Sequence, residues 1–129
     1  GGGGAARAAV LACQALGLKT VVAARNFDPD GLGVQWIPWA KRTSQQAGVV
    51  INATPIVDDT LWPADIALSA EIVFDLALGD APSPLLVRAR AEGATAITST
   101  EMWVTQGALQ MTWLTGTEIT ADSLRELMP

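Results

Sequence analysis

The sequence predicts an α/β fold with a parallel, doubly wound sheet, and three observations support this prediction. Short apolar runs alternate with helical segments along the whole chain, which is typical of strands joined by crossover helices. A cluster of glycines opens the first helical segment. The 129 residues, of which 50% are apolar and 16% are charged, suffice for one domain with a core and are too apolar for a disordered chain.

The glycine cluster and the elements directly behind it have the order of a nucleotide-binding unit. Residues 5–16 are rich in Ala and Leu and predict a helix, and residues 18–25 predict a strand. The spacing Gly1-x-Gly3-x-x-Ala6 fits the G-x-G-x-x-G/A fingerprint, in which glycines let the backbone approach a pyrophosphate at a helix N-terminus. A flexible tag remnant or a plain turn is the alternative, but the helix and the strand favour the phosphate-binding turn.

One piece of this unit is missing from the sequence. The fingerprint follows a buried strand that lies in the middle of such a sheet, and no strand comes before Gly1. Without that strand, the sheet would expose unpaired backbone groups and apolar faces. We expect the sequence to be a fragment of a longer protein, or another segment or a partner chain to supply the first strand.

Beyond a turn-rich stretch at residues 26–33, the remaining segments continue the alternation. Residues 34–39 predict a strand at an edge, because Pro38 does not fit the centre of a sheet. Capping residues and glycines delimit the other elements. We expect buried strands at residues 49–53, 71–76 and 94–98, a loop at 56–67, and helices at 40–47, 84–92, 101–115 and 121–127, the last three capped by Ser83, Thr100 and Thr120.

The composition excludes several classes of function. The chain has no histidine and no tyrosine, so we expect neither histidine-based acid–base chemistry nor a metal site. The net charge of −5 without a basic run argues against nucleic acid as a partner. Cys13 has no partner for an internal disulfide, and no segment resembles a signal peptide or a membrane span, so we expect a cytoplasmic protein without membrane contact.

Ligands of parallel α/β sheets bind beyond the carboxyl ends of the strands, so the residues that follow each strand are the site candidates. Arg25 suits a 2′-phosphate, which favours NADP over NAD, although a solvated arginine is the alternative. Thr54 either contacts a ribose or a phosphate, or ends its strand in a turn. Asp75 is more typical of a turn or cap than of a catalytic base, and nothing in the surroundings of Gln106 distinguishes it from a solvated helix residue.

Taken together, the motifs resemble those of the C-terminal nucleotide-binding domain of the shikimate dehydrogenase family, whose fold is Rossmann-like. GGGGAARA is similar to that family's glycine turn G-A-G-G-A-x-x-A, AARN to its N-R-T segment and INATP to its N-x-T-P segment. VFDLAL is similar to its D-L-x-Y strand end, SPLLVRARAEGA to its T-P-L-L helix and STEMWVTQGALQMTWLTG to its G-x-x-M-L-x-x-Q-A helix. The resemblance covers nearly the whole chain, with the motifs in the right order.

The resemblance implies that the domain binds NADP. In the complete protein it implies hydride transfer between NADPH and a small-molecule substrate, 3-dehydroshikimate or a related cyclic polyol acid, in the chorismate pathway of aromatic amino acid biosynthesis. It implies cofactor contacts from Gly1, Gly2, Gly3, Gly4, Ala5, Arg25, Asn26, Thr54, Leu76, Ser99 and Met102. It further implies a substrate contact from Gln106, and it places Leu78 where the family has a substrate-contacting tyrosine.

The resemblance also implies what the sequence lacks. The family's catalytic lysine and aspartate lie in an N-terminal substrate domain, so we expect no catalytic residue in this chain and no hydride transfer by it alone. The C-terminal helices, residues 101–128, are expected to pack back toward that substrate domain. A diverged relative that binds another nucleotide or polyol acid, or a non-catalytic regulatory domain, is the alternative.

Overall fold

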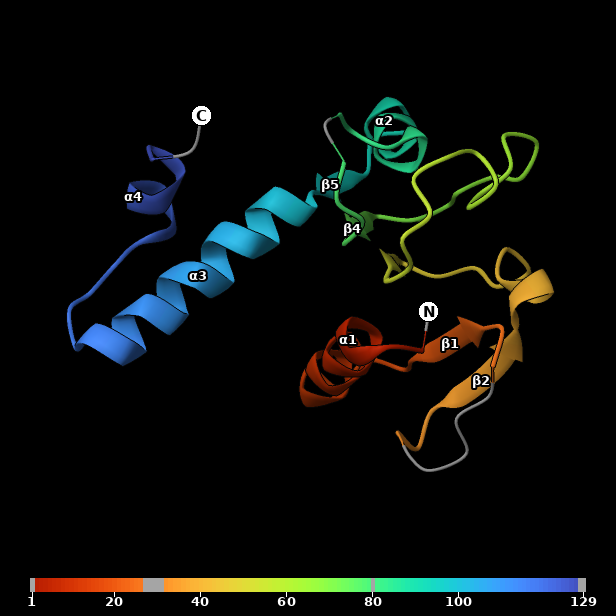
Figure 1. Cartoon of the computed structure of the whole chain (residues 1–129). Helices are drawn as coiled ribbons and strands as arrows, with labels where there is room; N and C mark the ends of the chain where they lie inside the picture. Colours follow the sequence, from red (N-terminus) through yellow and green to blue (C-terminus); the bar gives the residue numbers. More distant parts are fainter. Residues whose placement is uncertain (1, 27–31, 80, 128–129) are drawn as a thin grey trace.

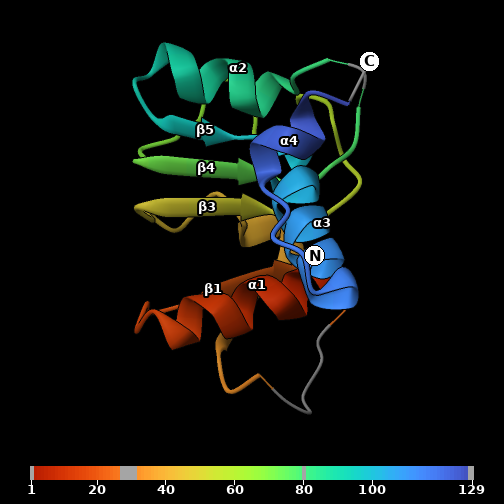
Figure 2. The same ribbon diagram turned by 90° about the vertical axis from the view of Figure 1, so that its left-hand side faces the viewer.

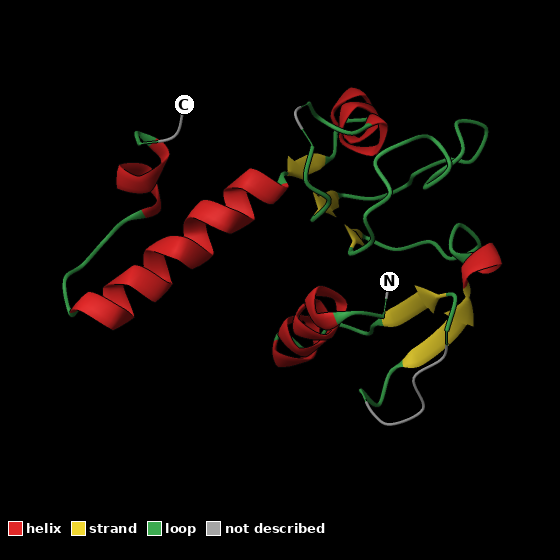
Figure 3. Ribbon diagram, in the orientation of Figure 1, coloured by secondary structure: helices red, strands yellow, loops and turns green. Residues whose placement is uncertain are grey.

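Parallel strands and the helices between them follow one another in the order α1-β1-β2-η1-β3-β4-α2-β5-α3-α4 (Figure 1). The computed structural model describes residues 2–26, 32–79 and 81–127. Within these residues the strands form two separate sheets, one of order β1-β2 and one of order β3-β4-β5, which Figure 3 shows as two groups of yellow arrows. Every strand pair is parallel, so the predicted parallel α/β fold is confirmed.

The first sheet lies beside helix α1, Gly4–Ala15 (Figures 1 and 2). Strand β1, Val21–Ala24, pairs with β2, Gln35–Pro38, which is an outer strand as the proline predicted. The turn-rich stretch predicted between these strands falls largely on residues 27–31, which lie outside the described part of the chain. Both strands are shorter than the runs that predicted them. Residues 18–20 and Arg25 lie outside β1, and Val34 and Trp39 lie outside β2.

The second sheet has β4, Ile72–Asp75, in the middle, between β3, Val49–Asn52, and β5, Thr95–Ile97. Helix α2, Pro84–Ala91, packs against β4 and β5. The core of the fold lies between this helix, the sheet and the connection from β3 to β4. Its buried side chains are Leu61, Leu68, Val73, Leu85, Leu86 and Ala89. Burial of each larger side chain contributes roughly 1.5–3 kcal/mol before the entropy cost of folding.

Two of the three predicted helix caps are confirmed. The hydroxyl of Ser83 accepts a hydrogen bond from the N–H of Leu86 at the start of α2. The hydroxyl of Thr120 accepts one from the N–H of Ser123 at the start of α4, Ala121–Arg125. Each bond satisfies one of the backbone donors that a helix start leaves without an intrahelical partner.

The predicted cap of the long C-terminal helix is wrong by two residues. Helix α3 spans Ser99–Thr115, and its N-cap is Thr98, not Thr100. The Thr98 hydroxyl accepts from the N–H of Glu101, and the Glu101 carboxylate accepts from the N–H of Thr98 over 2.7 Å. This reciprocal pair needs an acidic residue three positions after the cap, which Thr98 has and Thr100 lacks.

The helix predicted for residues 40–47 is also wrong. A single 3-10 turn, η1, covers Trp39–Lys41, and turns follow it. After this turn, the N–H and the hydroxyl of Ser44 both donate to the carbonyl oxygen of Lys41, three residues back. A serine side chain that takes a backbone acceptor competes with the hydrogen-bond pattern of a helix, so the chain turns instead. The guanidinium of Arg42 donates to the carbonyl oxygens of Thr60 over 2.6 Å and Leu61 over 2.7 Å.

The long connection from β3 to β4 is a loop, as predicted, and α2 holds it in place. Arg88 donates from Nη1 to the carbonyl oxygen of Pro63 over 3.0 Å and from Nη2 to that of Ile66 over 2.6 Å. Its Nε forms an ion pair with Glu92 over 2.6 Å. One guanidinium thus adds charge-assisted hydrogen bonds to two half-buried loop carbonyls. These carbonyls also accept from the N–H of Ile66 and from Nε1 of Trp62.

Candidate functional site

The carboxyl ends of the strands bring the predicted site residues to one edge of the fold. Arg25 and Asn26 follow β1, Thr54 comes after β3, Leu76 follows β4, and Ser99 begins the helix after β5. In Figure 2 the arrowheads of β3 and β4 point toward α3, and the N-terminal end of the chain lies on that same side. Parallel α/β sheets bind their ligands at this edge.

The glycine turn forms the start of α1 at this edge. Gly2, Gly3, Gly4 and Ala5 are all exposed, and Gly1 lies outside the described residues. Gly3 is the N-cap and makes no side-chain cap bond, and a Cβ at Gly3 or Gly4 would meet nothing within 4 Å. The first turn of α1 holds no acidic residue. The first backbone N–H groups of this twelve-residue helix therefore point into open space. The positive end of the helix dipole lies at the same place.

The end of β1 lies directly beside this turn. A Cβ at Gly2 would lie 3.9 Å from the Cβ of Ala24 and 4.0 Å from the carbonyl oxygen of Asn26. Arg25 and Asn26 are exposed. A cationic side chain and a helix N-terminus thus flank the same open region, an arrangement that favours an anion with more than one phosphate group.

A buried polar cluster joins the ends of β3 and β4 to the start of α2. Asn52 and Asp75 are 3% and 1% exposed. Asn52 Nδ2 donates to Asp75 Oδ1 over 2.8 Å and to the carbonyl oxygen of Ile56 over 3.0 Å. Ser83 Oγ donates to Asp75 Oδ2 over 2.5 Å, and the N–H of Ala77 donates to Asp75 Oδ1 over 2.9 Å. The cluster fixes the three loops that border the site.

Thr54 belongs to the same polar cluster. Its hydroxyl donates to Asn52 Oδ1 over 2.7 Å and accepts from the N–H of Ile56 over 3.2 Å. These bonds form a turn, which is one of the two roles that the sequence allowed for Thr54. The N–H of Leu76 donates to the carbonyl oxygen of Asn52 over 2.9 Å. Sequence reasoning missed Asn52 and treated Ser83 only as a cap. A strand-end Asn-x-Thr is the signal that could have found the first, since asparagine side chains bond their own backbone two residues on.

The residues expected beside the nicotinamide and the substrate are divided between α3 and the loop after β4. On α3, Ser99 is buried, Met102 is half-buried and Gln106 is exposed. In the loop, Leu76 is half-buried, while Leu78 is 78% exposed.

Among described residues, no group of three or more potential metal ligands comes together. None of the described helices combines the length and the apolar character that a membrane span requires.

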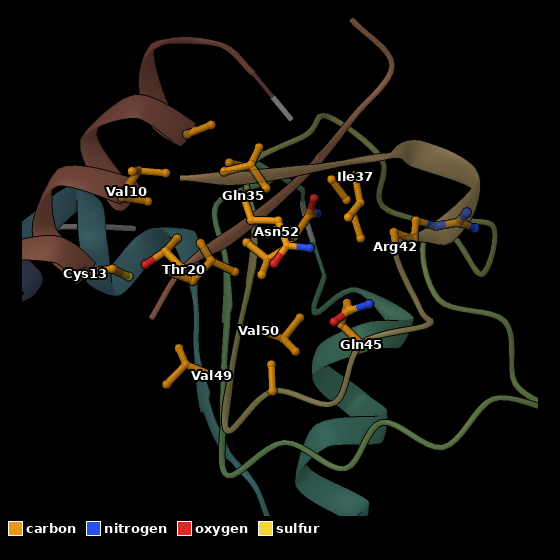
Figure 4. Close-up of a pocket in the computed structure, with 18 of the residues that line it drawn as sticks. Val10, Cys13, Thr20, Gln35, Ile37, Arg42, Gln45, Val49, Val50 and Asn52 are labelled. Carbon is orange, nitrogen blue, oxygen red and sulfur yellow. The ribbon is translucent and has the colours of Figure 1, made fainter. Parts of the chain in front are cut away.

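A cavity of about 570 Å³ lies between the two sheets (Figure 4). Its lining includes Val10 and Cys13 of α1, residues 21–23 of β1, Ile37 of β2 and all four residues of β3. Its position is that of the central strand that the glycine fingerprint requires, between the strand after α1 and the strand that begins the second half of the sheet. Within the described residues, β1 and β3 are outer strands of separate sheets, and the cavity lies between them.

Comparison with known proteins gives one consistent result. The chain is 34% identical to a shikimate dehydrogenase (NADP(+)) of a Synechococcus strain, over 98% of the chain and 52% of that protein. It is 29% identical to the enzyme of the same name from Maridesulfovibrio salexigens, over 99% of the chain and 52% of that protein. The chain spans about half the length of the curated relatives it matches. No protein-family model matches it.

Solved structures agree with the sequence relatives. A shikimate 5-dehydrogenase of Thermus thermophilus, solved in complex with shikimate, superposes with a TM-score of 0.73 at 26% identity, over 98% of this chain and 50% of that one. A chorismate mutase/shikimate 5-dehydrogenase fusion protein of Clostridium acetobutylicum shares the fold, with a TM-score of 0.76 at 23% identity, over 98% of this chain and 48% of that one. The chain is therefore similar, over nearly its whole length, to about half of a shikimate dehydrogenase, and it shares the Rossmann-like fold of that half.

Proposed function

We propose that the chain is the NADP-binding part of a shikimate-dehydrogenase-like oxidoreductase. In the complete protein, the reaction is reversible hydride transfer between NADPH and 3-dehydroshikimate or a related cyclic polyol acid. The observation that supports this most directly is the open N-terminus of α1 beside the exposed Arg25. The sequence relatives are named shikimate dehydrogenase (NADP(+)), and the proposed cofactor and substrate class are based on these names.

The residues at this edge suit a dinucleotide phosphate. Gly2, Gly3, Gly4 and Ala5 leave the amide groups at the start of α1 uncovered, and no acidic side chain in the first turn repels a pyrophosphate. Gly1 is proposed to add its backbone to this phosphate-binding turn. Arg25 and Asn26 would hold the adenosine 2′-phosphate, because a guanidinium forms paired, charge-assisted hydrogen bonds with phosphate oxygens.

The rest of the proposed cofactor path follows the carboxyl edge toward α3. Thr54 would lie along the ribose–phosphate chain, held in place by its bonds to Asn52. Leu76, Ser99 and Met102 would flank the nicotinamide and exclude water from it. NADPH supplies the hydride when bound, and this chain's residues bind and orient it.

We further propose that a substrate domain outside this sequence supplies the catalytic lysine and aspartate as a proton relay. Gln106 would reach a substrate hydroxyl from α3. Helices α3 and α4, within residues 101–128, would pack against that domain, which is supported by the large exposed apolar side chains on α3. These are Trp103, Leu109, Met111, Trp113 and Leu114.

Titration of NADPH into the full-length protein, followed by nicotinamide fluorescence, tests the binding proposal. Saturable binding, with NADP a better competitor than NAD, is the expected result. Oxidation of NADPH by 3-dehydroshikimate in the same material tests the reaction. Binding without turnover would leave the cofactor proposal standing and reject the substrate, whereas no binding at all would favour a regulatory domain that keeps only the fold.

Leu78 favours a second candidate function. It stands 78% exposed in the loop after β4, and a leucine has no group to hydrogen-bond a substrate carboxylate or hydroxyl. A leucine at this position fits a diverged dehydrogenase that uses the same cofactor with another polyol acid. Assaying shikimate, quinate and related cyclic acids with NADP in parallel would distinguish the two.

We also propose a cytoplasmic location, which the lone Cys13 supports.

A further inference from the structure

Asp75 is a buried carboxylate at the ligand edge of the second sheet. It is 1% exposed and is the last residue of β4, directly before Leu76. Among the described residues, no lysine or arginine forms an ion pair with it. Burying a carboxylate without a cation is costly, so we expect the charge to have a use beyond packing.

The hydrogen bonds around Asp75 hold it in the ionised form. Its Oδ1 accepts from Asn52 Nδ2 over 2.8 Å and from the N–H of Ala77 over 2.9 Å, and both of these groups are donors only. Its Oδ2 accepts from Ser83 Oγ. The Ser83 hydroxyl already accepts from the N–H of Leu86, and among the described residues only Asp75 accepts its proton. Neither carboxylate oxygen is therefore left to carry a proton.

The loops around Asp75 do not need its charge. An asparagine amide has an oxygen that can accept the bonds now made to Oδ1 and an NH₂ group that can donate to Ser83. The same contacts would then be made by a neutral group, which is less costly to bury. The hydrogen bonds thus explain the shape and polarity of the side chain at this position but not its charge.

The proposed dinucleotide crosses the ligand edge from the first sheet to the second. Arg25, the proposed 2′-phosphate contact, follows β1, and the glycine turn lies beside the end of that strand. A dinucleotide spans both halves of such a fold, so its nicotinamide half lies over the carboxyl ends of β3 and β4. Figure 2 shows these two strand ends side by side and directed toward α3. Asn52 and Asp75 are the last residues of the two strands and pair in register.

We propose that the charge of Asp75 makes the site select the oxidised form of the cofactor over the reduced form. The nicotinamide ring of NADP⁺ carries a positive charge, whereas the ring of NADPH, which has gained a hydride, is neutral. A buried carboxylate stabilises a positive charge near it because little water screens the attraction. Exposed carboxylates such as that of Glu101 are screened by water and contribute less. This proposal rests on the proposed function, since it requires a bound nicotinamide.

Binding of both cofactor forms to the full-length protein tests the role of the charge. The dissociation constants of NADP⁺ and NADPH are measured by calorimetry for wild type and for each variant. Asp75→Asn removes the charge and is expected to weaken NADP⁺ binding about tenfold and NADPH binding less than about twofold. Ser83→Ala removes one hydrogen bond but keeps the charge, so it should leave the ratio of the two constants unchanged. Asp65→Asn, which removes an exposed carboxylate, is the matched control and should also leave the ratio unchanged.

Three outcomes would overturn the proposal. Equal weakening of NADP⁺ and NADPH by Asp75→Asn would show that Asp75 only positions the loops. Unchanged affinities for both forms would show that its charge does not act on the cofactor. An equally large change of the ratio in Ser83→Ala would assign the effect to the hydrogen bonds. Asp75→Ser, which also removes the charge, takes the place of Asp75→Asn if the asparagine variant does not fold.

A ligand without the nicotinamide separates this proposal from the proposed function. 2′-Phospho-ADP-ribose should bind equally well to wild type and Asp75→Asn, because it lacks the ring whose charge is selected. A loss of its affinity as large as that of NADP⁺ would place the effect at the phosphates and overturn the role of Asp75. Failure of the wild type to bind NADP⁺, NADPH and 2′-phospho-ADP-ribose would reject the proposed function, and the selection by Asp75 with it.

Discussion

Asn52 Nδ2 donates a hydrogen bond to Asp75 Oδ1 over 2.8 Å, and this buried bond joins the ends of two neighbouring parallel strands at the ligand edge. Asp75 also accepts hydrogen bonds from Ser83 Oγ and from the N–H of Ala77. Both carboxylate oxygens therefore accept hydrogen bonds that hold the loops around the site. It is a positioning group, which agrees with the sequence-based expectation of a turn or cap residue.

Substitution of Asp75 tests this role. Asp75→Ala is expected to destabilise the fold by about 2–3 kcal/mol, because it leaves buried donors without an acceptor. Asp75→Asn should cost about 1 kcal/mol or less, since its amide oxygen can replace Oδ1 and its NH₂ can donate to Ser83. Urea unfolding measures both, with the exposed Asp65→Ala as the control. Equal losses for the alanine and asparagine variants would contradict the hydrogen-bond explanation.

Arg25→Asp tests the choice of nucleotide. The substitution is expected to weaken NADP binding by about 2 kcal/mol or more and NAD binding much less, because only NADP carries the 2′-phosphate. Competition titrations against NADPH measure both affinities, with Lys19→Ala, a change of an exposed basic side chain before the opposite end of β1, as the control. Equal weakening of NADP and NAD would reject the assignment of Arg25 to the 2′-phosphate.

Gly3→Asp separates stability from ligand binding. Gly3 is a helix N-cap with open space at its Cβ, so an aspartate there can cap α1 and is expected to stabilise the fold by a few tenths of a kcal/mol. The same carboxylate would repel a pyrophosphate and should abolish measurable NADPH binding. Thermal unfolding and fluorescence titration are the two measurements. Retained binding in a folded variant would place the phosphates away from α1.

Arg88 offers a test of how α2 holds the β3–β4 connection. Arg88→Lys is expected to cost about 1–2 kcal/mol, because an ammonium group cannot serve two loop carbonyls in the fixed geometry of a guanidinium. Glu92→Gln, which removes only the partly exposed ion pair, should cost less than about 0.5 kcal/mol. Urea unfolding of the two variants and of the wild type measures both losses in the free energy of unfolding. A larger loss in the Glu92 variant would make the ion pair, not the carbonyl bonds, the stabilising contact.

The capping box of α3 predicts a pH effect. The hydrogen bond from the Thr98 N–H is the largest cause that lowers the pKa of Glu101 below its ordinary value of 4.5, and burial opposes it. The Thr98 hydroxyl and the charges of Arg125 and Arg90 lower this pKa further. A lowered pKa in the folded state stabilises the fold above pH 4.5, and this contribution is lost as the pH falls through the folded pKa. Stability differences between wild type and Glu101→Gln should therefore be largest near neutral pH and vanish in acid.

Urea unfolding at neutral pH and at about pH 3 measures this difference. Glu118→Gln, a change of an exposed glutamate that caps no helix, is the matched control. A difference between wild type and Glu101→Gln that stays constant down to acid pH would show that the charge of Glu101 does not contribute.

The sequence by itself determined the order of helices and strands, the parallel pairing, the outer position of the strand with Pro38, and the caps Ser83 and Thr120. Each of these depends on residues close together in the chain, such as a hydroxyl three positions from an N–H or a run of β-branched side chains. The resemblance to shikimate dehydrogenases could also be predicted, because it follows from short motifs in a fixed order.

Only the tertiary structure decided the features that depend on distant residues. Arg42 bonds to the carbonyls of Thr60 and Leu61, which lie in the distant connection between β3 and β4. The polar cluster joins Asn52, Asp75 and Ser83, which are far apart in the sequence. No local pattern encodes such contacts, since the burial that makes each hydrogen bond strong exists only after the strands and helices have packed.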